Sequence, residues 1–315
     1  MVYKILVTEP EYFDDKAISS LYTVGSVKKI RLNNNEILNV ISDYDAIIIR
    51  VETTLNSKVL KRAKNLKVIG SATTGIEHID TKYTQAHHIP VFHLHGTHTI
   101  PTAEHTFALL LSLTRKIPWA FDSVKNGKWE RYKFIGNNLN GKQLGIVGLG
   151  RIGQQVAKIA TAFGMRVAYS DPNQKNIKLN RLSLNELMRT SDIISVHASL
   201  NQSSINLIDD TMLKLMKKDA LLINTSRAAI VDYKSLVNRL KKGYIKGAAI
   251  DVYSKEPVDN SSAYLISYAR AHQNLILTPH LGASTKETAF NAAKEISKSI
   301  AVYLTSLSTN KKSIR

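Results

Sequence analysis

The feature that most limits how this chain can fold is the glycine pattern Gly148-Leu-Gly150-Arg-Ile-Gly153. The apolar stretch Gln143–Val147 before it predicts a strand, and the stretch Gln154–Phe163 after it predicts a helix. Between a strand and a helix, this spacing is typical of a dinucleotide-binding loop. Its first glycine allows a tight turn, the second lets a pyrophosphate approach the backbone, and the third lets the helix pack closely on the strand. The pattern therefore predicts a parallel α/β sheet that binds such a cofactor.

The next predicted strand, Arg166–Ser170, is followed directly by Asp171. A carboxylate at this place accepts hydrogen bonds from both hydroxyls of the adenosine ribose and repels a 2′-phosphate. The sequence therefore predicts NAD rather than NADP as the cofactor.

Short apolar stretches alternate with helical ones on both sides of a polar segment that follows Pro118 and runs to Gly141. This alternation predicts doubly wound parallel sheets. The last helical stretch, Thr285–Leu304, is expected to return to the first domain, which gives domains at 1–98 with 285–315 and at 99–284. The predicted strands are Val2–Val7, Val27–Leu32, Asp45–Arg50, Leu66–Ser71 and Pro90–Leu94, then Leu144–Val147, Arg166–Ser170, Ile193–Val196, Leu221–Asn224, Ala248–Ile250 and Leu275–Leu277. The predicted helices include Glu11–Leu21, Glu36–Ile41, Ser57–Lys64 and Ala103–Ile117.

The composition excludes several classes of protein. With 315 residues, of which 43% are hydrophobic, the chain can bury two cores and is not disordered. No apolar run is long enough to cross a membrane, and the absence of cysteine excludes disulfides, thiolate nucleophiles and zinc sites built on sulfur. The net charge of +18 is spread along the sequence and not concentrated in one basic cluster, so we expect no nucleic-acid partner. We expect a soluble cytoplasmic protein.

Three polar segments follow predicted strands of the second domain, and each carries a residue suited to catalysis. They contain Arg227, Glu256 and His280. Arginine can clamp a carboxylate with two hydrogen bonds, and histidine can move a proton near neutral pH with a glutamate beside it. Taken singly, they also fit a surface ion pair, an ordinary loop acid and a capping residue. Because parallel strands end at one edge of the sheet, we expect the three side chains to lie near the dinucleotide loop.

Together with Gly148–Gly153, these segments resemble the D-isomer-specific 2-hydroxyacid dehydrogenase family, and the resemblance extends from Arg50 to Ser284. It implies a Rossmann NAD domain inserted in a flavodoxin-like substrate domain built from both chain ends. It also implies an NAD-dependent oxidoreductase that acts on the CH–OH group of a 2-hydroxy acid. Within the family, Gly127–Gly136 and Leu139–Lys142 are most similar to the phosphoglycerate dehydrogenases. That similarity implies oxidation of D-3-phosphoglycerate to 3-phosphohydroxypyruvate in serine biosynthesis.

The resemblance assigns roles by matching positions. Arg227 corresponds to the substrate-binding arginine, Glu256 to the glutamate and His280 to the acid/base. The segment around Trp129 reaches into a partner subunit in the family, so we expect a homodimer or homotetramer. The cofactor-binding positions are Thr74, Gly148, Gly150, Arg151, Ile152, Gly153, Asp171, Thr225, Asp251, His280 and Gly282, and the substrate-binding positions are Arg50, Thr74, Gly75, Arg131, Arg227 and His280.

Some positions depart from the family pattern. Ala228 stands where a glycine usually follows the arginine, and Glu52 would be unwelcome beside a phosphate bound at Arg50. No serine-binding regulatory domain is expected, because the sequence ends soon after His280. His93 and His95 could face one side of a strand, but the chemistry needs no metal and none is expected. The alternatives are a reductase of glyoxylate, hydroxypyruvate or another short 2-oxo acid, and a non-catalytic NAD-binding protein like the C-terminal-binding-protein corepressors.

Overall fold

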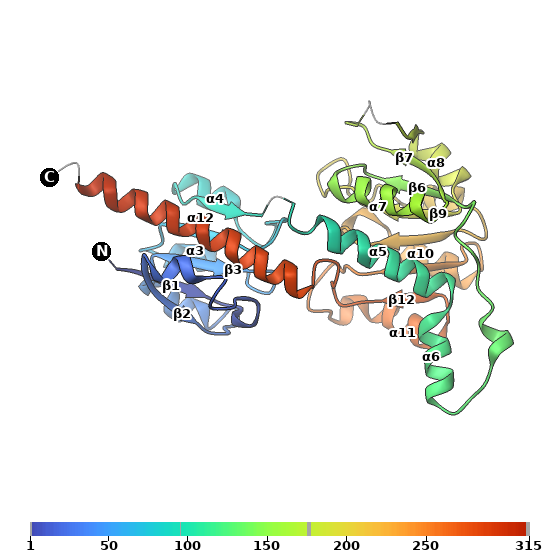
Figure 1. Ribbon diagram of the computed structural model, residues 1–315, viewed down its shortest axis with the longest axis horizontal. Helices are drawn as coiled ribbons and strands as arrows, with labels where there is room; N and C mark the ends of the chain where they lie inside the picture. The colour runs from blue at the N-terminus through green and yellow to red at the C-terminus, as the bar shows by residue number, and fades with distance from the viewer. Residues whose placement is uncertain (1, 95, 175–177, 313–315) are drawn as a thin grey trace. The chain divides into compact units, whose positions relative to one another are not determined.

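The structure, a computed structural model, describes residues 2–94, 96–174 and 178–312. The chain divides into two compact units, each with its own sheet (Figure 1). Unit 1 comprises residues 1–98 and 285–315, and unit 2 comprises residues 99–284. Within each unit every pair of neighbouring strands is parallel. The predicted fold class, α/β with two doubly wound parallel sheets, is confirmed.

Unit 1 has a sheet with the strand order β2-β1-β3-β4-β5. Because β2 lies on one side of β1 and β3 on the other, the strand order reverses at β1. The loops after β1 and β3 therefore lie at the switch point of the sheet, the place where ligands bind in such sheets. The strands are β1 (Tyr3–Val7), β2 (Gly25–Lys29), β3 (Ala46–Ile49), β4 (Val68–Ser71) and β5 (Val91–His93), and the α-helices are α1 (Ser19–Tyr22), α2 (Ile37–Val40), α3 (Ser57–Arg62), α4 (Thr81–Ala86) and α12 (Lys286–Lys312).

The C-terminal helix α12 belongs to the core of unit 1. Its residues Ile296, Ile300 and Leu304 are fully or almost fully buried in the cluster that contains Ile5. Gly70 in β4 allows this close packing, because a Cβ there would lie 3.0 Å from a side-chain carbon of Ile296. Figure 1 shows α12 in red beside the elements of unit 1.

Unit 2 has a sheet with the strand order β12-β11-β10-β9-β6-β7-β8. The order reverses at β6, which lies between β7 and β9, so the crevice predicted for a ligand is at the ends of β6 and β9. The strands are β6 (Gln143–Val147), β7 (Arg166–Ser170), β8 (Asn180–Arg181), β9 (Ile193–Val196), β10 (Leu221–Asn224), β11 (Gly247–Ile250) and β12 (Leu275–Leu277). The α-helices are α5 (Thr99–Thr114), α6 (Ile117–Lys125), α7 (Arg151–Ala162), α8 (Leu184–Thr190), α9 (Asp210–Leu215), α10 (Tyr233–Lys241) and α11 (Ala263–Ala271).

Some predicted elements were wrong. The helix predicted over Glu11–Leu21 is reduced to a 3-10 turn at Pro10–Tyr12 and the short helix α1. The polar stretch after Pro118 contains α6, which no pattern had indicated, and Pro118 lies in its first turn. A proline is tolerated there because the first backbone N–H groups of a helix have no partner within it.

Candidate active site

The glycine loop joins β6 to α7 as predicted. Gly148 has a φ of +90°, and a Cβ on it would lie 2.5 Å from the backbone nitrogen of Ala198. A Cβ on Gly153 would lie 2.3 Å from the carbonyl oxygen of Gly148. Gly150 caps α7 without a side-chain hydrogen bond, and a Cβ on it would meet no described atom within 4 Å. The loop thus presents open space at the start of a long helix, whose first backbone N–H groups have no acceptor within the helix, and this suits a pyrophosphate.

Asp171 is bound to this loop by its own carboxylate. Its Oδ2 accepts a hydrogen bond of 2.8 Å from the backbone N–H of Leu149. Its Oδ1 accepts hydrogen bonds from the backbone N–H groups of Asn173 and Gln174, at 2.8 and 3.1 Å. These three bonds fix the orientation of the carboxylate at the end of β7.

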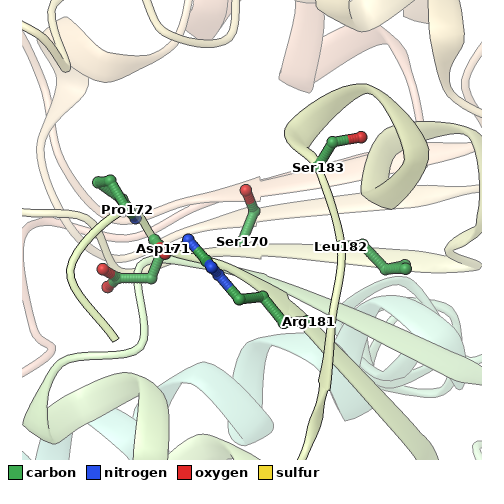
Figure 2. A pocket seen from close by; sticks show the side chains of 6 residues that line it. All are labelled: Ser170, Asp171, Pro172, Arg181, Leu182 and Ser183. Carbon is green, nitrogen blue, oxygen red and sulfur yellow. Dashed lines mark hydrogen bonds between the residues drawn. The ribbon is translucent and has the colours of Figure 1, made fainter. Parts of the chain in front are cut away.

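Asp171 also lines an open pocket of about 350 Å³, shown in Figure 2. Arg181 extends toward Asp171 in this view, and its Nη2 donates a hydrogen bond of 3.1 Å to the backbone oxygen of Asp171. The sequence did not indicate Arg181, because a single arginine on the two-residue strand β8 matches no motif. The lining residues are Ser170, Asp171, Pro172, Arg181, Leu182 and Ser183.

His280 and Glu256 form a hydrogen-bonded pair in unit 2. The Nδ1 of His280 lies 2.5 Å from Oε2 of Glu256, and both side chains are partly exposed. The other carboxylate oxygen of Glu256 accepts a hydrogen bond of 2.9 Å from the backbone N–H of Tyr253. Because Nδ1 donates to the carboxylate, Nε2 is the ring nitrogen left to exchange a proton with a ligand.

Asp251 organises the loop that carries His280. Its fully buried carboxylate accepts hydrogen bonds of 2.8 Å from the backbone N–H groups of both Leu281 and Gly282. Its backbone oxygen accepts another, of 2.9 Å, from the backbone N–H of His280. His280 itself has a φ of +54°, a backbone conformation that residues with a Cβ seldom adopt. The bonds to Asp251 hold the loop in that conformation.

Two side chains also bind the carboxylate of Asp251. The hydroxyl of Thr278 donates to it at 2.6 Å, and Nε2 of His105 in α5 lies 3.2 Å from it. Burial raises the pKa of Asp251, but the hydrogen bonds from His105, Thr278 and Leu281, with the nearby charge of His105, outweigh this effect and lower it. Asp251 is therefore held as the anion. His105 was not among the predicted site residues, because its contact to Asp251 joins positions far apart in the chain.

Thr225 and Arg227 follow β10. The hydroxyl of Thr225 is buried and lies 2.9 Å from that of Thr106 in α5. Nη1 of Arg227 donates a hydrogen bond of 2.9 Å to the backbone oxygen of Ser226. Ala228 begins a 3-10 turn over Ala228–Ile230 and has no positive φ, so the alanine fits where the family pattern has glycine.

Of the predicted site residues, Arg50, Thr74 and Gly75 lie in unit 1, and the others lie in unit 2. The Thr74 hydroxyl is 3.1 Å from Nδ1 of His98, and the backbone oxygen of Gly75 accepts a hydrogen bond from Thr73. Arg50 is buried at the end of β3. Unit 2 contains Arg131, Arg227, Glu256, His280, Gly148, Gly150, Arg151, Ile152, Gly153, Asp171, Thr225, Asp251 and Gly282.

The histidine-rich segment shows no metal site. Over residues 2–94, 96–174 and 178–312, no group of three or more His, Asp or Glu side chains could hold a metal ion. His95 lies outside the described residues. No helix in the same ranges has the length and apolar character needed to cross a membrane.

The model of the family "D-isomer specific 2-hydroxyacid dehydrogenase, NAD binding domain" matches residues 107–282. This chain belongs to that family. It therefore carries the family's NAD-binding domain, and the predicted cofactor, NAD, is confirmed.

Curated relatives include D-3-phosphoglycerate dehydrogenases from two microorganisms. The Archaeoglobus fulgidus protein is 36% identical over 94% of this chain, and the Bacillus subtilis protein is 35% identical over 95% of it. The match covers 56% of the length of each relative, so the chain spans little more than half of these proteins.

A solved structure shares the fold of both units. The D-lactate dehydrogenase of Aquifex aeolicus, complexed with NAD and lactic acid, is 26% identical, with a TM-score of 0.86 and 96% of each chain covered.

Proposed function

We propose that this protein is an NAD-dependent dehydrogenase of D-2-hydroxy acids, and that D-3-phosphoglycerate is its substrate. The hydrogen-bonded pair of His280 and Glu256 carries the proposal, because it supplies a proton acceptor for a substrate hydroxyl in the unit that holds the glycine loop. The curated relatives named D-3-phosphoglycerate dehydrogenase support the choice of substrate.

In the oxidative direction, Nε2 of neutral His280 takes the proton of the substrate hydroxyl. The carboxylate of Glu256 stabilises the resulting imidazolium through Nδ1–H, and Asp251 holds the loop. The chemistry that bound NAD would supply is the acceptor for the hydride at C2 of the hydroxy acid. Arg227 binds the substrate carboxylate with its guanidinium. In reduction, protonated His280 returns the proton.

Arg50 in unit 1 is the observation that favours a phosphorylated substrate, since a buried guanidinium favours an anionic ligand. We propose that Arg50, Thr74 and Gly75 contact the substrate, and that Thr74 also contacts the cofactor. We further propose that the phosphate-bearing end of the substrate is recognised by Arg50.

The test is a panel of 2-oxo acids reduced with NADH, including 3-phosphohydroxypyruvate, hydroxypyruvate, glyoxylate and pyruvate. We expect the highest kcat/KM for 3-phosphohydroxypyruvate. His280→Ala should lower kcat about 10²–10⁴-fold with NADH binding unchanged, because general acid–base catalysis contributes that much. His87→Ala, at an exposed histidine of unit 1, serves as the matched control and should keep full activity.

A higher kcat/KM for glyoxylate or hydroxypyruvate would favour the short 2-oxo acid reductase. A protein that binds NADH and reduces none of the acids would favour a non-catalytic NAD-binding role.

We also propose that unit 2 pairs with a second copy of the chain, as a homodimer or within a homotetramer. Several large apolar side chains on and after α6 are exposed, Trp129 by 84% and Tyr132 by 82%. Arg131, exposed between them, is then a candidate substrate contact across the dimer. Sedimentation of the wild type and of Phe121→Asp tests this, because a charge placed in an apolar contact should dissociate the dimer. The exposed apolar residues are Ile117, Phe121, Val124, Trp129, Tyr132 and Ile135.

A further inference from the structure

Arg50 is a buried cation directly after β3, at the switch point of the sheet of unit 1. It is 8% exposed, and its guanidinium carbon lies 3.9 Å from the centre of the Tyr12 ring. Within residues 2–94, 96–174 and 178–312, its side chain has no hydrogen bond or ion pair. Burial lowers the pKa of Arg50, and the charges of Tyr12, Glu9 and Glu52 offset only part of this effect. An unpaired buried charge is costly, so Arg50 favours an anion from solution.

Glu9, which follows β1, supports the loop after β3. It is 2% exposed, and its carboxylate accepts hydrogen bonds from the backbone N–H groups of Arg50, Thr53 and Glu52, at 2.8, 3.2 and 3.4 Å. These bonds fix the backbone of the loop and occupy the carboxylate of Glu9. Glu9 thus sets the shape of the loop and leaves the guanidinium of Arg50 without a bonded anion.

Glu52 is the carboxylate that could compete for Arg50, since it is two residues away and its charge acts on Arg50. The carboxylate of Glu52 is bound by Arg31, which lies shortly after β2. Nη1 of Arg31 donates to Oε2 of Glu52. The other side of the same guanidinium binds Glu11 with two hydrogen bonds of 2.9 Å each. Arg31 is therefore fixed by Glu11 while it binds Glu52.

We propose that Arg31 is a positioning residue that keeps the carboxylate of Glu52 away from Arg50, so that Arg50 remains available to an anionic group of the substrate. This inference rests on the proposed function, and it names a residue that sets the specificity of that site. Without Arg31, the carboxylate of Glu52 loses its partner and competes with the anion for Arg50. The proposed function makes this anion the phosphate of the substrate, and the substrate carboxylate is the alternative that the test distinguishes, since a guanidinium binds both.

The test uses Arg31→Gln, Glu52→Gln and the double variant. Titration calorimetry with inorganic phosphate measures anion binding without turnover, and KM for 3-phosphohydroxypyruvate is measured with NADH. Arg31→Gln should weaken phosphate binding and raise KM about ten- to hundredfold, with kcat little changed. The reason is that the carboxylate of Glu52 can then form a charged hydrogen bond with Arg50 and compete with the anion. The double variant should recover wild-type values, because the competing carboxylate is gone. Arg62→Gln, at an exposed arginine of α3, is the matched control and should behave as the wild type.

Rescue by Glu52→Gln separates this role from a structural one, since a loop that had lost its fold would not regain phosphate binding. A larger effect on 3-phosphohydroxypyruvate than on hydroxypyruvate assigns the anion as the phosphate, and equal effects assign it as the carboxylate. Unchanged phosphate binding in Arg31→Gln, no rescue in the double variant, or no phosphate binding by the wild type overturns the inference. If the wild type reduces none of the 2-oxo acids, the proposed function fails, while the phosphate titration still decides the role of Arg31.

Discussion

His197, which directly follows β9, provides a prediction with a calculable magnitude. Its Nε2 lies 2.7 Å from the hydroxyl of Ser195, and its buried Nδ1 has no hydrogen-bond partner in the described part of the chain. Burial lowers the pKa of His197 to about 3. The imidazole is therefore neutral in the folded protein, whereas in the unfolded chain it takes up a proton near pH 6.5.

This difference makes the stability of unit 2 depend on pH. The stability contributed by neutral His197 is fully present above pH 6.5 and is lost as the pH falls toward 3, because only the unfolded chain gains a proton in that range. The imidazole of the folded protein is still neutral at pH 5. The free energy of unfolding lost by pH 5 is therefore set by the 1.5 pH units between pH 5 and the ordinary histidine pKa of about 6.5. At 1.36 kcal/mol per unit, the free energy of unfolding falls by about 2 kcal/mol between pH 8 and pH 5.

The assay is urea unfolding followed by tryptophan fluorescence. The chain has two tryptophans, Trp119 and Trp129, and both lie in unit 2 with His197, so the signal reports the unit concerned. His197→Asn removes the titrating group and should remove about 2 kcal/mol of the change between pH 8 and pH 5. His272→Asn, at an exposed histidine of the same unit, should keep the wild-type dependence. Equal pH dependence in the wild type and His197→Asn, or an NMR signal of His197 that titrates near pH 6.5, would refute the reasoning.

Three further outcomes are expected from the residues of unit 2. NAD should exceed NADP at least tenfold in kcat/KM, about 1.4 kcal/mol, because the fixed carboxylate of Asp171 repels a 2′-phosphate; comparable kinetics with both cofactors would remove Asp171 from the ribose site. Glu256→Gln should lower kcat of oxidation, because the imidazolium that forms on His280 loses a neighbouring negative charge; an unchanged kcat would break the pairing. Asp251→Asn should destabilise unit 2 by about 1–3 kcal/mol, since the buried N–H groups of Leu281 and Gly282 lose a charged acceptor, and chemical unfolding measures this loss.

The strands of unit 2 could be predicted closely from the sequence. The predicted bounds of Arg166–Ser170, Ile193–Val196 and Leu221–Asn224 are those of β7, β9 and β10. Strands β9 and β10 are buried throughout, and a strand buried on both faces reads as an unbroken apolar run. The short helices of unit 1 were harder to predict from the sequence than these strands. α4 (Thr81–Ala86) was not predicted, because its six residues include one that is buried and so carry little periodicity.

Part of the geometry around the candidate residues could be predicted, namely where motifs follow strand ends. Glu256 and His280 are 24 positions apart, and their hydrogen bond was expected because parallel strands β11 and β12 end at the same edge. His105, Arg31 and Arg181 could not be found this way. Each is a single charged or polar side chain whose role depends on a partner distant in the sequence, and no local pattern marks such a pair.

The departures from the family pattern show why a single substituted position is weak evidence against a function. Considered with Arg50 alone, the negative charge of Glu52 argues against an anion bound at Arg50. The structure adds Arg31, which lies about twenty positions earlier in the sequence and binds that carboxylate. Whether an anion can bind at the edge of a sheet depends on all the charged side chains that lie there. In unit 1 these side chains come from the loops after β1, β2 and β3. For this reason, the charge of Glu52 cannot be counted against an anion at Arg50 without the hydrogen bond that Glu52 accepts from Arg31.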